Sequence, residues 1–196
     1  MYFLFFLLLI LASLFLYGFI RKGVFYSYCM AALARRNVAK PNFFQCVAIV
    51  LMDRAVMALA IYRLNYKIGN PFVGRFLTNF GHLLTGVEIY FNAELGSGFQ
   101  LWHGQGTVIG QNSKVGKNTL ILHQVTLGSG FVVVGNGVKI GCGAKLLGNI
   151  EVGDGCVISA NAVVTKDVPP GKLVKIDGTL LDIDENKEII FGTRLP

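Results

Sequence analysis

The stretch IGQNSKVGKNTLILHQVTLGSG, residues 109–130, decides the fold, because an aliphatic residue returns in it at every sixth position. The same period continues after a short break through VGNGVKIGCGAKLLGNIEVGDGCVISANAVV, residues 134–164. A six-residue period is too short for a helical repeat and indicates a β-helix built of short strands and turns. We expect three hexads to close one triangular coil, with the aliphatic residues inside and glycine at the corners. The leading positions are Ile89, Leu95, Leu101, Ile109, Val115, Ile121, Leu127, Val134, Ile140, Leu146, Val152, Ile158 and Val164.

Two steps in the repeat are longer than six residues, and both are candidates for the functional region. The step from Leu101 to Ile109 is eight residues long and surrounds His103. The step from Leu127 to Val134 is seven residues long and contains Gly-Ser-Gly. Insertions in solenoid proteins usually lie on the binding face, although a tolerated loop explains such insertions as well.

Two of the three histidines fall in register with the repeat. His103 follows Leu101 by two residues, His123 follows Ile121 by two residues, and these leading positions are three hexads apart. The coil therefore stacks the two imidazoles about 4.8 Å apart in rise. Glu88 lies near the preceding coil, where its carboxylate can accept a hydrogen bond from an imidazole and orient a general-base histidine. The competing interpretation is a pair of polar turn residues.

These motifs resemble the left-handed β-helix acyltransferases of the hexapeptide-repeat superfamily, from GVEIYFNAELGSGFQLWHG at residues 86–104 to Pro-Pro-Gly at residues 169–171. Within it, the chain is most similar to the serine acetyltransferase group and its polysaccharide O-acetyltransferase relatives of the colanic-acid type. The resemblance covers roughly residues 85–171. It implies a mainly β fold, a left-handed parallel β-helix, and a homotrimer in which acetyl-CoA and the acceptor meet between neighbouring subunits.

The resemblance also implies which residues are catalytic. His103 matches the histidine that takes a proton from the acceptor hydroxyl as the oxygen attacks the thioester. Glu88 stands where serine acetyltransferases have the aspartate paired with that histidine. His123 stands where they have glutamine and where colanic-acid-type enzymes have histidine. We therefore expect His103, Glu88 and His123 to be catalytic.

Acetyl-CoA is the co-substrate that the resemblance implies. Gly128 and Ser129 match a Gly-Gly pair near the thioester, and Cys142 and Ala160 match small residues that line the path of the pantetheine arm. No metal is expected. A γ-type carbonic anhydrase, another hexapeptide β-helix, needs three zinc histidines, two of them five residues apart, whereas the two in-register histidines here are twenty residues apart.

Two departures from serine acetyltransferases bear on the acceptor. Trp102 replaces the aspartate before the catalytic histidine, and the loop after Gly128 is short and lacks the Arg-His pair that helps to bind serine. An amino-acid substrate needs charged partners for its ammonium and carboxylate groups. The departures thus predict a sugar hydroxyl as the acceptor, with Trp102 against the sugar, and leave serine as the alternative.

The N-terminal half has a different composition from the repeat. Residues 1–82 carry a net charge of +8 and 11 of the 15 phenylalanines, whereas residues 83–196 carry a net charge of −1. Residues 1–20 carry no charge, and a helix of that length rises about 30 Å, enough to cross a bilayer core. A cleaved signal peptide is the alternative. The basic residues that follow place the body of the protein in the cytoplasm by the positive-inside rule.

The region between this segment and the repeat is predicted to be helical. Residues 42–67 are expected to form a helix that lies on the membrane or packs in a bundle, with a second span as the alternative, because Asp53 and Arg54 interrupt its apolar run. Pro71 is expected to end the helical region, with a short connector over residues 72–85.

The predicted organisation has four parts: a transmembrane helix over 1–20, a basic, apolar, helical membrane-proximal region over 21–84, the β-helix over 85–171 and a C-terminal cap over 172–196. The predicted function is O-acetylation of a saccharide in a capsule, exopolysaccharide or O-antigen precursor. The predicted location is the bacterial inner membrane, with one span, a cytoplasmic catalytic domain, and membrane lipid or a lipid-linked saccharide as partner. Nucleic acid is not expected, because the basic half is also the apolar half. Serine O-acetylation and a non-catalytic membrane scaffold are the alternatives.

Overall fold

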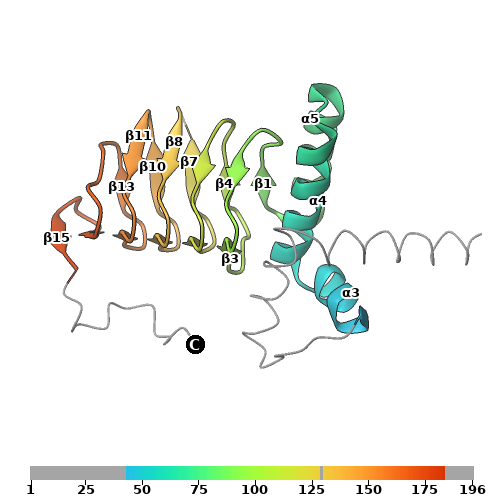
Figure 1. Cartoon of the computed structure of the whole chain (residues 1–196), viewed down its shortest axis with the longest axis horizontal. Helices are drawn as coiled ribbons and strands as arrows, with labels where there is room; N and C mark the ends of the chain where they lie inside the picture. Colours follow the sequence, from blue (N-terminus) through green and yellow to red (C-terminus); the bar gives the residue numbers. More distant parts are fainter. Residues whose placement is uncertain (1–42, 129, 184–196) are drawn as a thin grey trace, which may run out of the picture.

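The computed structural model describes residues 43–128 and 130–183. It shows a parallel β-helix with helices at one end and the last strand, β15, at the other (Figure 1). Sheet A consists of β1 (Glu88–Ile89), β4 (Val108–Ile109), β7 (Thr126–Gly128), β10 (Lys145–Leu147) and β13 (Val163–Val164). Sheet B consists of β2 (Glu94–Leu95), β5 (Lys114–Val115), β8 (Val132–Val134) and β11 (Ile150–Val152). Sheet C consists of β3 (Gln100–Leu101), β6 (Leu120–Ile121), β9 (Lys139–Ile140), β12 (Val157–Ile158), β14 (Lys172–Val174) and β15 (Leu180–Asp182).

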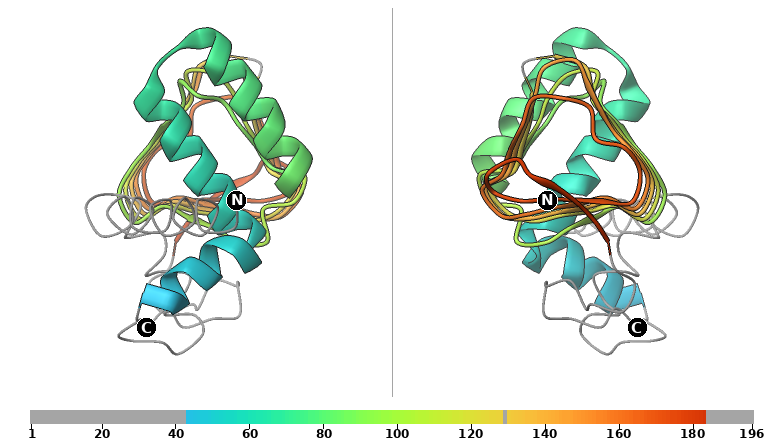
Figure 2. Two further views of the ribbon diagram at one scale, coloured as in Figure 1. Left: turned by 90° about the vertical axis from the view of Figure 1, so that its right-hand side faces the viewer. Right: turned by 90° about the vertical axis from the view of Figure 1, so that its left-hand side faces the viewer.

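The three sheets form the sides of a triangle when the coil is viewed along its axis (Figure 2). Strands β1 to β14 pair in parallel with the strands of neighbouring coils, so that Ile109 faces Ile89 on one side and Leu127 on the other. All thirteen leading positions of the repeat are buried inside the triangle. The parallel β-helix predicted from the six-residue period is therefore confirmed, because that period places one aliphatic residue per strand in the core.

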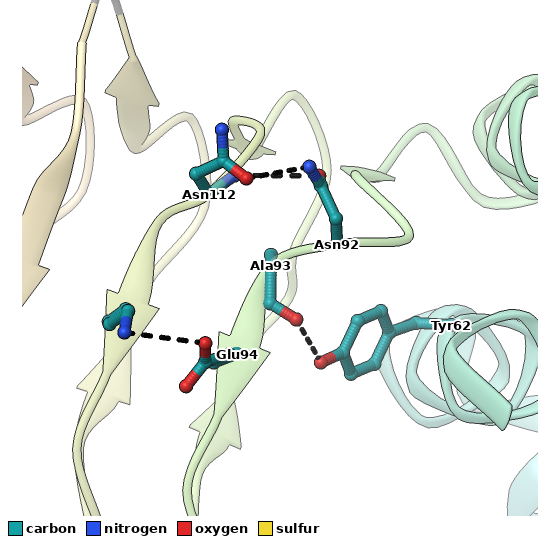
Figure 3. A network of polar contacts seen from close by, with 6 residues as sticks. Tyr62, Asn92, Ala93, Glu94 and Asn112 are labelled. Atoms are coloured by element: carbon teal, nitrogen blue, oxygen red, sulfur yellow. Dashed lines mark hydrogen bonds and ion pairs between the residues drawn. The ribbon is translucent and has the colours of Figure 1, made fainter. Parts of the chain in front are cut away.

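Within the described residues, three helices precede the coil: α3 (Phe43–Met52), α4 (Arg54–Ile68) and α5 (Pro71–Thr85). Helices α4 and α5 lie across the open end of the first coil (Figure 2). The Tyr62 hydroxyl donates a 2.6 Å hydrogen bond to the carbonyl oxygen of Ala93 (Figure 3), and the Arg63 guanidinium donates to the carbonyl oxygen of Leu95. These bonds satisfy carbonyl groups at the first coil, which has no earlier coil to pair with, so the helices act as a cap.

The helical region differs from the prediction at two points. Asp53 breaks the helix expected over residues 42–67, because its carboxylate accepts hydrogen bonds from the backbone N–H groups of Ala55 and Val56 and starts a new helix there. The connector expected over residues 72–85 is also wrong, since these residues belong to α5. Pro71 occupies the first turn of α5 behind an Asn70 cap, a position where proline favours a helix start.

None of the helices in the described part of the chain is both long and apolar enough to cross a membrane. Helices α4 and α5 contain 15 residues each, and such a helix rises about 22 Å, less than the roughly 30 Å of a bilayer core. The transmembrane helix predicted over residues 1–20 lies outside the described residues.

The far end of the coil is covered by a hairpin. Strand β15 pairs antiparallel with β14, so it covers the outer edge of sheet C. Lys172 and Asp182 form an ion pair across this hairpin. The hairpin falls in the region predicted to cap the coil, and residues 184–196 of that region lie outside the described residues.

Candidate active site

Four residues predicted to belong to the site share one corner of the triangle, between sheet C and sheet A. Each of the four follows, by two positions, a strand residue of sheet C. These strand residues are paired in register in the order Leu101, Ile121, Ile140 and Ile158. The register continues past the strands, because the N–H of Gly143 donates to the carbonyl oxygen of His123. We call this set of residues the corner column, which consists of His103, His123, Cys142 and Ala160.

The two imidazoles of the corner column face each other edge to face. Their ring centroids are 6.1 Å apart, and the angle between the ring planes is 79°. His103 is exposed to solvent, whereas His123 is half-buried. The stacking predicted from the repeat period therefore brings the two histidines next to each other on neighbouring coils.

The two inserted residues of the first long step shape the turn at His103. His103 has a φ of 63°, in the left-handed region, and Gly104 after it has a φ of 57°. A Cβ atom on Gly104 would lie 3.0 Å from side-chain atoms of Leu101 and Val87. Glycine is therefore needed directly after His103 for both conformation and space.

One nitrogen of the His123 ring is buried. This atom, Nδ1, has no hydrogen-bond partner among the described residues. A buried imidazole nitrogen without a partner is uncommon, because the nitrogen has given up its hydrogen bonds to water. The second nitrogen, Nε2, is therefore the one that this ring can offer to a ligand.

Glu88 lies at the start of β1, where its side chain points outward from sheet A. It is in register with Val108 on the next coil and, through Val108, with Thr126 on the coil after that. The carboxylate of Glu88 makes no hydrogen bond to either imidazole in the described structure. The structure thus places Glu88 on the sheet beside the corner column without joining it to His103.

Trp102 immediately precedes His103 and is half-buried. Its indole Nε1–H donates a 3.0 Å hydrogen bond to the side-chain oxygen of Gln100. This bond fixes the ring beside the corner column.

A hollow of about 460 Å³ lies along the outer side of sheet A. It extends from Val108 and Thr126, which follow the corner column, to Gly128 and Phe131 at the opposite corner. The Phe131 side chain is 59% exposed at the rim of this hollow. Gly128, which is predicted to lie near the thioester, lines the hollow, whereas Ser129 lies outside the described residues.

Sequence reasoning missed two aromatic residues and one cation at this hollow. Tyr90 and Phe131 line it, and the Arg75 guanidinium donates a 2.8 Å hydrogen bond to the Tyr90 hydroxyl while lying 5.2 Å from the centre of its ring. The available signal was that Tyr90 directly follows the leading residue Ile89, and that Phe131 lies within the second long step. The six-residue repeat does not indicate that α5 packs near this sheet.

The remaining polar groups do not form a metal centre. Within residues 43–128 and 130–183, no three His, Cys, Asp or Glu side chains are grouped so that they can hold a metal ion. Cys156 lies in the core, where burial raises the pKa of its thiol, and the thiol donates a hydrogen bond to the carbonyl oxygen of Pro169.

A family model of hexapeptide transferases recognises part of this coil of six-residue repeats. The bacterial transferase hexapeptide model (six repeats) matches residues 131–166. A serine acetyltransferase of Helicobacter pylori is 36% identical over 105 residues, which cover 52% of this chain and 60% of that protein. The chain thus spans about three fifths of the length of this curated relative.

Solved structures narrow the class further. The serine acetyltransferase of Neisseria gonorrhoeae in complex with serine superposes with a TM-score of 0.69 at 31% identity, covering 81% of this chain and 67% of that one. A serine acetyltransferase in complex with CoA gives a TM-score of 0.68 at 30% identity, with 79% and 67% covered. The chain therefore belongs to the hexapeptide-repeat acyltransferases of the serine acetyltransferase type.

These relatives correct three predictions made from the sequence. The saccharide O-acetyltransferase function is wrong, because the comparisons support the serine acetyltransferase branch and not the polysaccharide branch. The predicted membrane-lipid or lipid-linked saccharide partner is not supported either. The location as a single-pass inner-membrane protein with a cytoplasmic catalytic domain is contradicted by the same relatives, and no described helix can cross a membrane. The departures at the acceptor end are few, whereas the likeness to serine acetyltransferase covers 81% of the chain.

Proposed function

We propose that this protein transfers the acetyl group of acetyl-CoA to the hydroxyl group of serine. The observation that carries the proposal is the corner column, in which an exposed His103 stands beside a second imidazole. A hollow of about 460 Å³ lies on the adjoining sheet A. Similar proteins solved with serine and with CoA supply the two ligands to test first. A left-handed coil and a homotrimer, both expected from the resemblance, belong to the same proposal.

His103 acts as the general base in this proposal. Its imidazole accepts the proton of the serine hydroxyl as the oxygen attacks the carbonyl carbon of the thioester. The carbon–oxygen bond forms, the tetrahedral intermediate collapses, and the carbon–sulfur bond breaks to release CoA. Catalytic hydrogen bonds often tighten only when substrate is bound, so we keep Glu88 as the carboxylate that orients the imidazole.

The acetyl-CoA arm lies along the corner column, beyond the two histidines. Cys142 and Ala160 occupy the next two coils, and their small side chains leave room for a thin chain on the surface. Three steps between neighbouring coils cover about 14 Å, so the column offers a track of that length from His103 to Ala160. Gly128, at the hollow, is assigned to the thioester end of the same ligand.

Serine requires charged partners that the short loop after Gly128 lacks. The Arg75 guanidinium at Tyr90 supplies a positive charge next to the hollow, where it can bind a carboxylate. Trp102, fixed beside His103, closes the acceptor region on one side. In this proposal, Arg75 takes the place of the arginine expected from the resemblance.

The experiment that tests this proposal measures CoA release from acetyl-CoA with a thiol reagent, with and without L-serine. We expect release that depends on serine, yields O-acetylserine by mass spectrometry, and falls at least 100-fold in His103→Ala. His82→Ala is the matched control, since His82 lies exposed on α5, and it should retain the wild-type rate. The proposal is wrong if serine does not raise CoA release by the wild-type protein.

A further inference from the structure

We propose that His123 donates the hydrogen bond that stabilises the oxyanion of the tetrahedral intermediate. This role rests on the proposed acetyl transfer and adds a second catalytic residue to it. The proposed base is His103, so the neighbouring imidazole has no assigned task. Three observations support this role: the distance between the two rings, the burial of one His123 nitrogen, and the contacts already made by nearby donors.

The distance between the rings suits a reacting carbon held between them. The base hydrogen-bonds to the attacking oxygen, and the donor hydrogen-bonds to the oxyanion. Both oxygens are bonded to the same tetrahedral carbon. Such a path places the two imidazole nitrogens roughly 4–7 Å apart. The ring centroids of His103 and His123 lie 6.1 Å apart. The two rings are therefore close enough for one tetrahedral centre to contact a nitrogen of each.

The burial of Nδ1 favours the tautomer that this role requires. Nδ1 of His123 is buried and has no hydrogen-bond partner in the described structure. Burying an N–H group without an acceptor is among the least tolerated arrangements in proteins. The proton of a neutral His123 ring is thus expected on Nε2, which makes the ring a donor at the nitrogen that is free to meet a ligand.

Two other side-chain donors near this corner are already engaged. The indole N–H of Trp102 donates to Gln100, and the Lys145 ammonium donates to the backbone carbonyl oxygen of Gln124 at 2.7 Å. The described residues of the loop after β7, Gly130 and Phe131, carry no polar side-chain atom. Within the corner column, His123 is the residue beside the proposed base that has an N–H group to offer to a ligand.

The step is balanced as follows. The serine oxygen forms a bond to the carbonyl carbon, its proton moves to His103, and the carbonyl electron pair moves onto oxygen, where the His123 N–H binds it. When the carbon–oxygen double bond re-forms, the carbon–sulfur bond breaks and the proton held by His103 leaves with CoA or with solvent. His123 keeps its own proton throughout, so it is neither acid nor base in this step.

The test compares two variants of the full-length protein, His123→Gln, which keeps an N–H donor, and His123→Leu, which has none. Loss of one oxyanion donor lowers kcat by about 100-fold to 1,000-fold. We expect a fall of that size in His123→Leu, a fall of less than 10-fold in His123→Gln, and little change in the KM for acetyl-CoA or in CoA binding measured by calorimetry. His82→Leu is the control for the loss of a histidine.

Each outcome decides between distinct explanations. Equal losses in both variants with a changed pH–rate profile would show that His123 transfers a proton, which overturns the donor role. Equal losses with weaker CoA binding and a lower Tm would show a structural role and overturn it as well. If the wild-type protein shows serine-dependent activity and His123→Leu is unaffected, the donor role of His123 is wrong and the proposed function stands. An inactive wild-type protein overturns the proposed function first.

Discussion

The hydroxyl of Tyr62 donates a 2.6 Å hydrogen bond to the carbonyl oxygen of Ala93, and this contact joins the helical cap to the first coil. Tyr62 is 2% exposed, so the acceptor cannot turn to water if the hydroxyl is removed. We expect Tyr62→Phe to lower the free energy of unfolding by about 1–3 kcal/mol, measured by denaturant titration. Tyr66→Phe is the control, since Tyr66 is largely exposed, and it should change this energy by less than about 0.5 kcal/mol. Equal effects would show that the bond does not hold the cap.

Asp53 separates α3 from α4 by capping the second helix. Asp53→Ala removes the acceptor for the N–H groups of Ala55 and Val56, and a lost N-cap costs about 0.5–2 kcal/mol. Asp53→Asn keeps a capping oxygen and should lose less than half as much in the same denaturation experiment. If both variants unfold at the wild-type denaturant concentration, the cap does not contribute to stability.

Two glycines of α5 are expected to respond differently to alanine. A Cβ on Gly74 would lie 2.7 Å from the Phe91 ring, whereas a Cβ on Gly81 would lie 3.3 Å from Ile61. Overpacking costs about 1–3 kcal/mol, so Gly74→Ala should lower the Tm. Gly81→Ala gains up to about 1 kcal/mol of helix propensity, and this gain offsets the tight contact with Ile61. Its Tm should therefore stay close to that of the wild type. A lower Tm for Gly81→Ala alone would contradict the packing described here.

The two cysteines of the coil differ in reactivity. Cys142 is half-buried in the corner column, whereas Cys156 lies in the core, where burial raises the pKa of its thiol and reduces the reactive thiolate. Iodoacetamide at pH 8 should therefore label Cys142 at least 10-fold faster, as measured by peptide mass spectrometry. Saturating acetyl-CoA, which has no free thiol to consume the reagent, should slow the labelling of Cys142. It should not slow the labelling of Cys156 after denaturation. No protection by acetyl-CoA would argue against the ligand path proposed along the corner column.

Ala160 tests the same path by steric block. Ala160→Phe places a large ring on the corner column three coils from His103, and it should raise the KM for acetyl-CoA at least 10-fold while the KM for serine changes little. Lys117→Phe adds a similar ring at an exposed position of the corner between sheets B and C and serves as the control. A raised KM for serine instead would place the acceptor, and not the donor, on this part of the column.

The core and the histidine register could be predicted because the β-helix encodes them locally. One aliphatic residue every six positions fixes the strand register, so the positions of His103 and His123 follow from counting along the chain. The cap could not be predicted in the same way. Pro71 reads as a helix end or as a helix start, and only the Asn70 cap and the contacts of α5 with the coil decide between them.

The hollow on sheet A depends on contacts between distant segments. Arg75 comes from α5, Tyr90 from the first coil and Phe131 from the third, and no short motif connects them. The acceptor and the location were predicted wrongly for a related reason. Trp102 and the short loop were read as changes of substrate, and the apolar composition of residues 1–20 was read as a location, although neither pattern outweighs the likeness of the whole coil.

Four successive coils of the β-helix each contribute one residue to the corner column. The length of the donor site can therefore change without a change in the residues that carry out the reaction. A coil such as the one from Ile140 to Ile158 occupies 18 residues. Duplicating or deleting such a unit changes the track for the ligand arm by about 4.8 Å and leaves the surroundings of both imidazoles unchanged. A lineage with this architecture can therefore adapt to longer or shorter donors by duplicating short gene segments, without rebuilding its reaction centre.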